Sequence, residues 1–203
     1  MRALVVTDLQ CDFMPGGALP VPHADEVVAV ANRVARRFEL VVATQDWHPR
    51  NHGSFASNHP GRKPGDVVEL GGVAQVLWPD HCVQHTRGAE LVAGLDTSRL
   101  AGVFHKGIDP EIDSYSALYD NAHRRSTGLS EWLKARGVDE VWLLGVATDY
   151  CVRATALDAR REGLRAVLVE DGCRGVELKG GDSEAAIQEM RANGVEVVRS
   201  AAA

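Results

Sequence analysis

Short runs of β-branched and aliphatic residues alternate along this chain with longer amphipathic segments, and this alternation limits the fold more than any other feature. The short runs are apolar at consecutive positions, which is typical of strands covered on both faces. Strands separated by helical segments form a parallel sheet with right-handed crossover connections. We expect about six strands of this kind, at residues 3–7, 40–44, 100–104, 140–146, 165–169 and 195–198.

The segments between these runs have the pattern and the end signals of helices. Residues 25–38 place their valines on one stripe, and residues 127–136 begin at a threonine and stop before Gly137. Further helices are expected at 149–162 and 183–192. The prediction is an α/β fold of three layers, a doubly wound sheet of mainly parallel strands with helices on both faces. It forms one domain over residues 1–200, with a frayed tail at 201–203.

The composition argues against several classes of function. The chain has 22 Lys and Arg against 28 Asp and Glu, a net charge of −6, so a basic face for nucleic acid is not expected. No run of about 18 apolar residues is present, so we expect no membrane partner. The N-terminal segment does not resemble a signal peptide, and the four cysteines contain no CxxC pair. We therefore expect a cytoplasmic protein with reduced thiols.

Three expected loops are longer than the fold needs. They span residues 8–22, 46–87 and 106–126. Long loops within a compact domain are usually functional or disordered. Each of these three follows the carboxyl end of an expected strand, the edge where open α/β sheets bind ligands. The sequence therefore places the candidate site at this edge.

Three titratable residues from distant segments are expected at that edge. Asp8 follows the first strand, Lys106 follows the third, and Cys151 comes just after the fourth. A thiolate at Cys151 would be favoured by a helix N-terminus and by a nearby lysine, while a carboxylate could exchange its proton. Taken singly, each residue has an ordinary alternative as a buried filler, a turn residue or a solvated charge. Their meeting at one edge favours nucleophilic catalysis.

A second group of residues suggests a divalent metal. Asp46 and His48 are two positions apart in an extended segment, so their side chains point to the same side. His81 could supply a third ligand. Two imidazoles and one carboxylate suit Zn²⁺, with Fe²⁺ or Mn²⁺ as alternatives. Spacing alone does not fix the third ligand, because other histidines share the same loop.

Several motifs carry a resemblance over nearly the whole chain. In order, they are VTDLQCDF (6–13), PGG (15–17), TQDWHP (44–49), NHGSFA (51–56), WPDHCVQ (78–84), HKG (105–107), DSYSA (113–117) and GVATDYCV (145–152). In this combination the chain resembles the nicotinamidases of the isochorismatase-like cysteine hydrolase superfamily. The resemblance implies hydrolysis of nicotinamide to nicotinate and ammonia through a thioester, in NAD salvage, with pyrazinamide as a further substrate.

The resemblance also implies roles for individual residues. Cys151 matches the nucleophile, Asp8 the general acid and base, and Lys106 the cation of the triad. The metal ligands of the superfamily fall on Asp46, His48 and His81. Some relatives use a further histidine, for which His52 is the candidate, near the metal rather than bound to it.

The remaining implied residues surround the substrate. The family has a non-proline cis peptide, here between Val146 and Ala147, that turns the N–H groups of Ala147 and Cys151 toward an oxyanion. Aromatic walls around a pyridine ring match Phe13, Trp78 and Tyr115, although an ordinary core role competes for Tyr115. Ala147 also belongs to the expected substrate-binding set.

Other functions compete with this interpretation. Carbamoyl-type amidases generally lack the D-x-H and P-x-H-C residues, and isochorismate hydrolases lack the cysteine. A redox-sensing protein would not require Asp8 and Lys106 near Cys151. A dinucleotide-binding oxidoreductase would need GxGxxG after the first strand, where this chain has Asp-Leu-Gln. The native metal and the choice between monomer and homo-oligomer stay open.

Overall fold

A single parallel sheet forms the centre of the protein. The computed structural model describes all 203 residues, and six strands pair in the order β5-β2-β1-β6-β7-β8. Every pairing in this sheet is parallel, which confirms the predicted fold class. The strands are β1 (Arg2–Thr7), β2 (Leu40–Asp46), β5 (Leu100–Lys106), β6 (Glu140–Val146), β7 (Arg165–Arg174) and β8 (Glu196–Val198).

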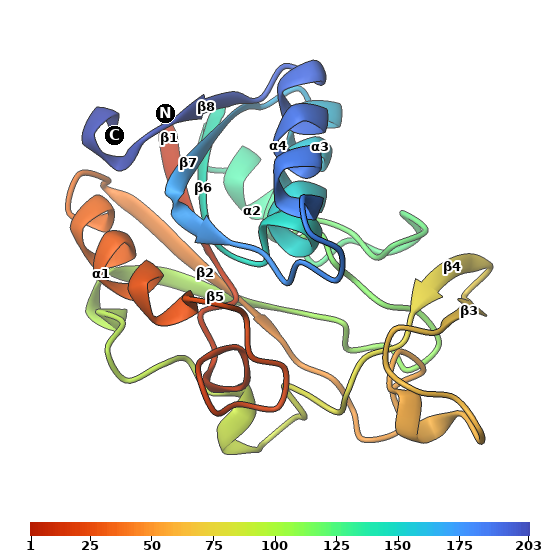
Figure 1. Cartoon of the computed structure of the whole chain (residues 1–203). Helices are drawn as coiled ribbons and strands as arrows, with labels where there is room; N and C mark the ends of the chain where they lie inside the picture. The colour runs from red at the N-terminus through yellow and green to blue at the C-terminus, as the bar shows by residue number, and fades with distance from the viewer.

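Helices cover both faces of this sheet. They are α1 (Ala24–Ala35), α2 (Leu129–Lys134), α3 (Arg153–Arg161) and α4 (Asp182–Ala192). Helix α1 lies on one side, and α3 and α4 lie together on the other (Figure 1). The strand order explains this arrangement. The chain moves outward in opposite directions from β1 and from β6, so right-handed crossovers place the helices on opposite faces.

The hydrophobic core lies between the sheet and these helices. The residues of β1 and β2 that face the two helix layers are almost fully buried, as the unbroken apolar runs predict. Phe38, just after α1, packs edge-on against Trp142 of β6 with ring centroids 5.6 Å apart. The core thus fixes the strands whose carboxyl ends carry the functional residues.

The strands extend further than the apolar runs predict. Strand β2 ends at Asp46 rather than residue 44, and β5 ends at Lys106 rather than 104. Strand β7 continues to Arg174 instead of stopping at 169. The apolar pattern cannot reveal these last positions because their side chains are polar although their backbones still pair. Two of the charged residues singled out above are therefore strand residues.

The helix expected at 149–162 is not continuous. A π-helical turn, Thr148–Val152, precedes α3 and contains Cys151. Helix α1 ends at Ala35, three residues before the predicted end at 38, and α2 is shorter than expected at both ends. These shifts change the ends of the elements and leave their order intact.

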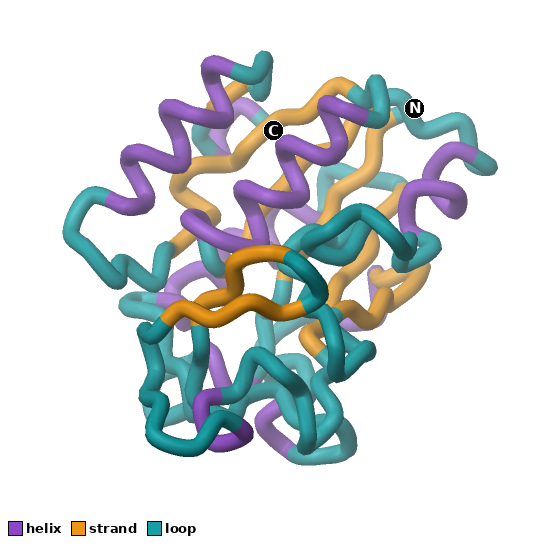
Figure 2. Tube along the Cα trace, turned by 90° about the vertical axis from the view of Figure 1, so that its right-hand side faces the viewer, coloured by secondary structure: helices purple, strands orange, loops and turns teal.

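The loop expected at 46–87 contains a hairpin that the sequence reasoning missed. Strands β3 (Val67–Leu70) and β4 (Val73–Val76) pair antiparallel, apart from the main sheet (Figures 1 and 2). The two turn residues, Gly71 and Gly72, have φ angles of 60° and 81°. Glycine is suited to positive φ at both positions of such a turn. The apolar alternation is too short here to stand out from a loop.

Short 3-10 turns complete the chain. They are Cys11–Phe13, Ala56–Asn58, Arg87–Ala89, Thr97–Arg99 and Ser200–Ala202. Arg37 Nη1 donates a hydrogen bond of 2.7 Å to the carbonyl of Ala203. The single domain at 1–200 and the frayed tail stay predictions. None of the helices has the length and apolar character needed to cross a bilayer.

Candidate active site

Four neighbouring strands bring the candidate residues to one edge of the sheet. Asp8 follows β1, Asp46 ends β2, Lys106 ends β5, and Cys151 lies in the turn after β6. Because β5, β2, β1 and β6 are adjacent in the sheet, their carboxyl ends lie side by side. The predicted edge therefore gathers these side chains.

Lys106 is the centre of this group. Its side chain is only 1% exposed, and its Nζ lies 2.9 Å from Asp8 Oδ2 and 3.3 Å from Cys151 Sγ. The same ammonium donates to Asp46 Oδ1 and, at 3.2 Å, to the carbonyl of Ser114. A buried ammonium needs compensating partners, and here two carboxylates and a carbonyl provide them. The triad expected from the sequence is in direct contact.

Neighbouring charges determine the direction in which the pKa values of Lys106 and Asp46 are shifted. Burial alone would lower the pKa of Lys106, but Asp46 and Asp8 raise it well above its ordinary value. Burial opposes ionisation of Asp46, yet Lys106 and His48 hold its pKa well below the ordinary range. Lys106 and Asp46 therefore form a stable charged pair beside the thiol.

The thiol itself differs from the sequence expectation. Burial raises the pKa of Cys151 well above its ordinary value, and the Asp8 and Asp46 carboxylates add to this, against the lowering effect of Lys106. A nearby lysine and a helix N-terminus favour the thiolate, whereas the removal of water around the sulfur raises the pKa of the thiol. Burial thus favours the neutral thiol, and a base that takes its proton would favour attack by the sulfur.

Asp8 is placed to be that base. Its Oδ1 accepts a 2.6 Å hydrogen bond from Thr44 Oγ1, and its buried Oδ2 lies 2.9 Å from the Lys106 ammonium. One of its carboxylate oxygens lies within 4.8 Å of Cys151 Sγ. Burial raises the pKa of Asp8 above the ordinary 3.8, and Lys106 opposes this. A carboxylate with a raised pKa close to the sulfur is a suitable acceptor for the thiol proton.

The turn before Cys151 provides a hydrogen-bond donor. The peptide bond between Val146 and Ala147 is cis. The Ala147 carbonyl accepts hydrogen bonds from the N–H groups of Tyr150 and Val152, both at 3.1 Å, whereas the Ala147 N–H has no partner within the chain. Ala147 lines the same cavity as Cys151. Its N–H is therefore available to an oxygen of a bound molecule.

The predicted metal ligands also come together. The Nε2 atoms of His48 and His81 each lie 3.8 Å from Asp46 Oδ2. His48 Nδ1 bonds to the Gly107 carbonyl and His81 Nδ1 to the Pro79 carbonyl, both at 2.8 Å. A carbonyl only accepts, so each Nδ1 carries a proton, and in the neutral rings each Nε2 has a lone pair for a metal. This donor set of two nitrogens and one oxygen fits a divalent metal.

Gly107 is required beside His48. It has a φ angle of 62°, and a Cβ at this position would lie 2.3 Å from His48 Cε1. A larger residue could not occupy this position without displacing the imidazole. The glycine of the HKG motif therefore serves the metal ligand, while the lysine serves the thiol.

His52 lies next to the three candidate ligands. It is fully buried, its Nδ1 bonds to Ser54 Oγ at 2.7 Å, and its Nε2 has no partner. Burial lowers the pKa of His52 to about 4, so the ring is neutral. Candidate ligand atoms of His48, His52 and Asp113 lie within 4.8 Å of one another. His52 thus lies next to the three candidate ligands, and its place near a bound metal rather than on it stays a prediction.

A small apolar cavity joins the thiol to the metal ligands. All four residues expected to bind the substrate line it: Phe13, Trp78, Tyr115 and Ala147. Tyr150, missed by the sequence reasoning, packs edge-on to both Trp78 and Tyr115, with ring centroids 4.9 and 5.4 Å away. Leu19 and Val176 complete the apolar wall. The cavity therefore suits a flat ring.

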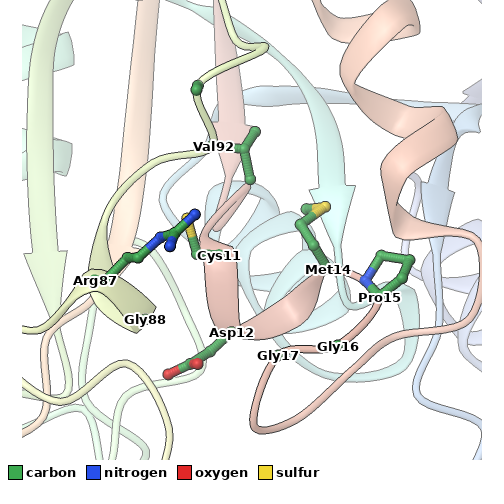
Figure 3. A pocket seen from close by; sticks show the side chains of 10 residues that line it. Cys11, Asp12, Met14, Pro15, Gly16, Gly17, Arg87, Gly88 and Val92 are labelled. Atoms are coloured by element: carbon green, nitrogen blue, oxygen red, sulfur yellow. The ribbon is translucent and has the colours of Figure 1, made fainter.

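A larger cavity lies beside this site. It has a volume of about 510 Å³ and is formed by the loops around Cys11 and Arg87 (Figure 3). The Asp12 carboxylate on its rim accepts hydrogen bonds from the N–H groups of Cys82 and Ala18 and so serves the loops themselves. No histidine or lysine accompanies Cys11 there. The smaller cavity is the one that combines a nucleophile, a base and a donor set.

Some residues of the site gave a weak sequence signal or none. Asp113 lies in the DSYSA motif, but the motif alone does not indicate a role for its side chain. Gln10 and Thr44 also lie in quoted motifs; Gln10 Nε2 donates to the Asp46 carbonyl and its Oε1 accepts from the Asp46 N–H, both at 2.8 Å. Gln75 lies in no motif. Only the folded chain shows what these polar residues contact.

Comparison with known proteins gives a consistent picture. The family described as Isochorismatase domain matches residues 2–202. A nicotinamidase of Escherichia coli is 50% identical over 197 residues, covering 95% of this chain and 92% of that one. A solved Acinetobacter baumanii nicotinamidase/pyrazinamidase superposes with a TM-score of 0.96 at 46% identity, covering 99% and 97% of the two chains. A pyrazinamidase of Pyrococcus horikoshii in complex with zinc has a TM-score of 0.79 at 41% identity, covering 98% of each. The chain therefore belongs to the isochorismatase domain family.

Proposed function

We propose that this protein is an amidohydrolase that converts nicotinamide to nicotinate and ammonia through a cysteine thioester. The observation that carries the proposal is the contact of Lys106 with both Asp8 and Cys151 beneath a cavity walled by aromatic rings. The nicotinamidases and pyrazinamidases to which the chain is similar support the choice of substrate. Pyrazinamide carries the same carboxamide and a ring nitrogen, so we propose it as a second substrate.

The first step is attack by the thiol. Cys151 Sγ forms a bond to the carboxamide carbon while its proton passes to the carboxylate of Asp8. The carbonyl π electrons move to oxygen, and the oxyanion accepts hydrogen bonds from the N–H groups of Ala147 and Cys151. In other enzymes one such donor contributes about 3–4 kcal/mol. Lys106 stabilises the sulfur as negative charge develops on it.

The second half of the reaction returns the enzyme to its starting state. Asp8 protonates the amide nitrogen, and the carbon–nitrogen bond breaks. Ammonia departs, and the acyl group stays on Cys151 as a thioester. Asp8 then takes a proton from water, and the water oxygen attacks the thioester carbon. The carbon–sulfur bond breaks, nicotinate is released, and Asp8 returns the proton to the sulfur. Throughout, Lys106 keeps its charge, since its pKa is raised well above the ordinary value.

Asp46, His48 and His81 would hold a divalent metal at the other end of the cavity. When bound, that ion would act as a Lewis acid toward the ring nitrogen and would so orient the carboxamide toward Cys151. We propose Zn²⁺, because two nitrogens and one oxygen suit it and the Pyrococcus horikoshii pyrazinamidase was solved in complex with zinc. The expected cytoplasmic location, and the expected absence of nucleic-acid and membrane partners, stay predictions.

One assay tests the proposed function directly. The purified protein is incubated with nicotinamide, and ammonia and nicotinate are measured before and after treatment with a chelator, beside elemental analysis of bound metal. We expect equal amounts of the two products, loss of turnover with loss of the metal, and recovery on adding zinc. A metal-loaded protein that releases no ammonia from nicotinamide would contradict the proposal.

The Thr44 hydroxyl offers a test of the role of Asp8. A hydrogen bond to a carboxylate favours the charged form, so Thr44 lowers the pKa of Asp8. Thr44→Val removes this donor, and the pKa of Asp8 should rise. Because the base must be ionised, the acid limb of the kcat/KM profile should move to higher pH by the same amount. An unmoved limb in an active variant would exclude Asp8 as the titrating base.

A further inference from the structure

Gln75 is a fully buried polar residue on the otherwise solvent-facing β3–β4 hairpin. Its amide reaches across to the segment that follows β5. Gln75 Nε2 lies 2.8 Å from the Val76 carbonyl, 2.9 Å from Asp113 Oδ2 and 2.9 Å from the Tyr115 hydroxyl. Its Oε1 accepts from Asn121 Nδ2 at 3.3 Å. Asp113 and Tyr115 both line the substrate cavity, whereas Gln75 does not. The hairpin therefore holds part of the cavity wall through one amide.

Asp113 fixes which way this amide points. An ionised carboxylate only accepts hydrogen bonds, so the NH₂ end of Gln75 must face Asp113. The opposite orientation would place two acceptor oxygens against each other. The two protons of this NH₂ group are shared among the Val76 carbonyl, Asp113 and the Tyr115 hydroxyl oxygen, and because the amide nitrogen cannot accept, the hydroxyl can only accept from it. The direction of this hydrogen bond follows from the chemistry of the three groups.

Tyr115 receives a second hydrogen bond from Trp78. The indole Nε1–H is only a donor, and it lies 3.2 Å from the Tyr115 hydroxyl oxygen. Two donors thus occupy the two lone pairs of this oxygen. No group of the chain accepts the hydroxyl proton of Tyr115, and the side chain borders the cavity. The free proton is therefore directed toward whatever the cavity binds.

This network lies at the metal end of the cavity. A carboxylate oxygen of Asp113 lies within 4.8 Å of ring nitrogens of His48 and His52. Asp113 also accepts a 2.8 Å hydrogen bond from the N–H of Ser114, which keeps its carboxylate in place. The Tyr115 hydroxyl shares the Gln75 amide with Asp113 and, like Asp113, borders the cavity.

We propose that Gln75 is a positioning residue that holds Tyr115 in place as a hydrogen-bond donor to the bound substrate. The inference rests on the proposed function, because that function places a heteroaromatic ring in this cavity. Gln75 acts through Tyr115 and Asp113 and touches neither the substrate nor Cys151. Its loss should therefore weaken binding in the ground state and the transition state alike, which raises KM and leaves kcat nearly unchanged.

Steady-state kinetics on nicotinamide with Gln75→Leu and Tyr115→Phe tests this. Each variant should raise KM by about fivefold to tenfold with kcat within about twofold, as expected for one lost hydrogen bond. The double variant should raise KM no more than Tyr115→Phe alone, since both substitutions remove the same interaction. Gln75→Met serves as a second variant of similar volume, and Glu69→Ala, an exposed change on the same hairpin, is the matched control.

The outcomes separate this inference from the proposed function. A wild-type protein without activity on nicotinamide contradicts the proposed function. An active wild type whose variants keep the wild-type KM contradicts the positioning role. Multiplying effects in the double variant, or a fall in kcat that matches a fall in melting temperature, would make Gln75 a structural residue only. A KM increase without loss of melting temperature supports the inference.

Discussion

Cys151→Ala is expected to lower the turnover of nicotinamide by at least about 10⁴-fold, as removal of a catalytic nucleophile does in other hydrolases. No other thiol can replace it: Cys82 and Cys173 are buried, and none of the other three cysteines lines the substrate cavity. The cavity wall and the metal ligands are unchanged by this substitution. Binding of nicotinate, measured by calorimetry, should therefore stay close to that of the wild type.

Cys11→Ser is the matched control for this experiment. Cys11 is a partly exposed thiol outside the substrate cavity, so the variant should keep wild-type turnover. Ammonia release by Cys151→Ala at a rate near that of the wild type would end the assignment of the nucleophile. Loss of both turnover and nicotinate binding would indicate instead that Cys151 shapes the cavity.

The second large effect is expected at His81. His81→Ala removes one nitrogen donor and leaves the ion pair of Lys106 with Asp46 intact. Zinc affinity should fall by more than about 100-fold, because even the outer partners of metal ligands contribute about 10–100-fold. Activity at low zinc should be lost with the metal. Competition with a chromophoric chelator measures the affinity.

Asp46→Ala should behave differently from His81→Ala. It removes a metal ligand and also a carboxylate partner of the buried Lys106 ammonium. Breaking a buried pair in this way costs about 3–5 kcal/mol of stability. Denaturant unfolding without metal should therefore show a large loss for Asp46→Ala and a small one for His81→Ala. His23→Ala, at an exposed histidine, should match the wild type in both measurements. Equal stabilities for the two ligand variants would contradict a dual role for Asp46.

The sequence is informative about the parts of the site that adjoin strands. Apolar runs place six strands in the right order along the chain, and the order places Asp8, Lys106 and Cys151 at one edge. The i, i+2 spacing of Asp46 and His48 correctly predicts that both point to one side, because the segment is extended. Local rules suffice wherever a functional residue lies within a few positions of a regular element.

Other features depend on neighbours that are distant in the sequence. The raised pKa of Cys151 results from complete burial by several segments, which neither a helix N-terminus nor a nearby lysine reveals. The role of Gln75 depends on a short hairpin that packs against residues 113–121. A polar residue in a short, weakly alternating strand gives no signal until its partners are known. These are effects of tertiary packing, and single-sequence patterns do not contain them.

Asp46 presents one oxygen to the Lys106 ammonium and the other to the imidazoles of His48 and His81. A cation drawn to one oxygen withdraws electron density from the other, so the two halves of the site are thermodynamically linked. By reciprocity, a change that strengthens the hold on the ammonium must weaken the affinity for the ion. Attempts to exchange the metal by redesigning its ligands will therefore also change the charges around Cys151. The metal ligands and the nucleophile cannot be engineered independently of each other.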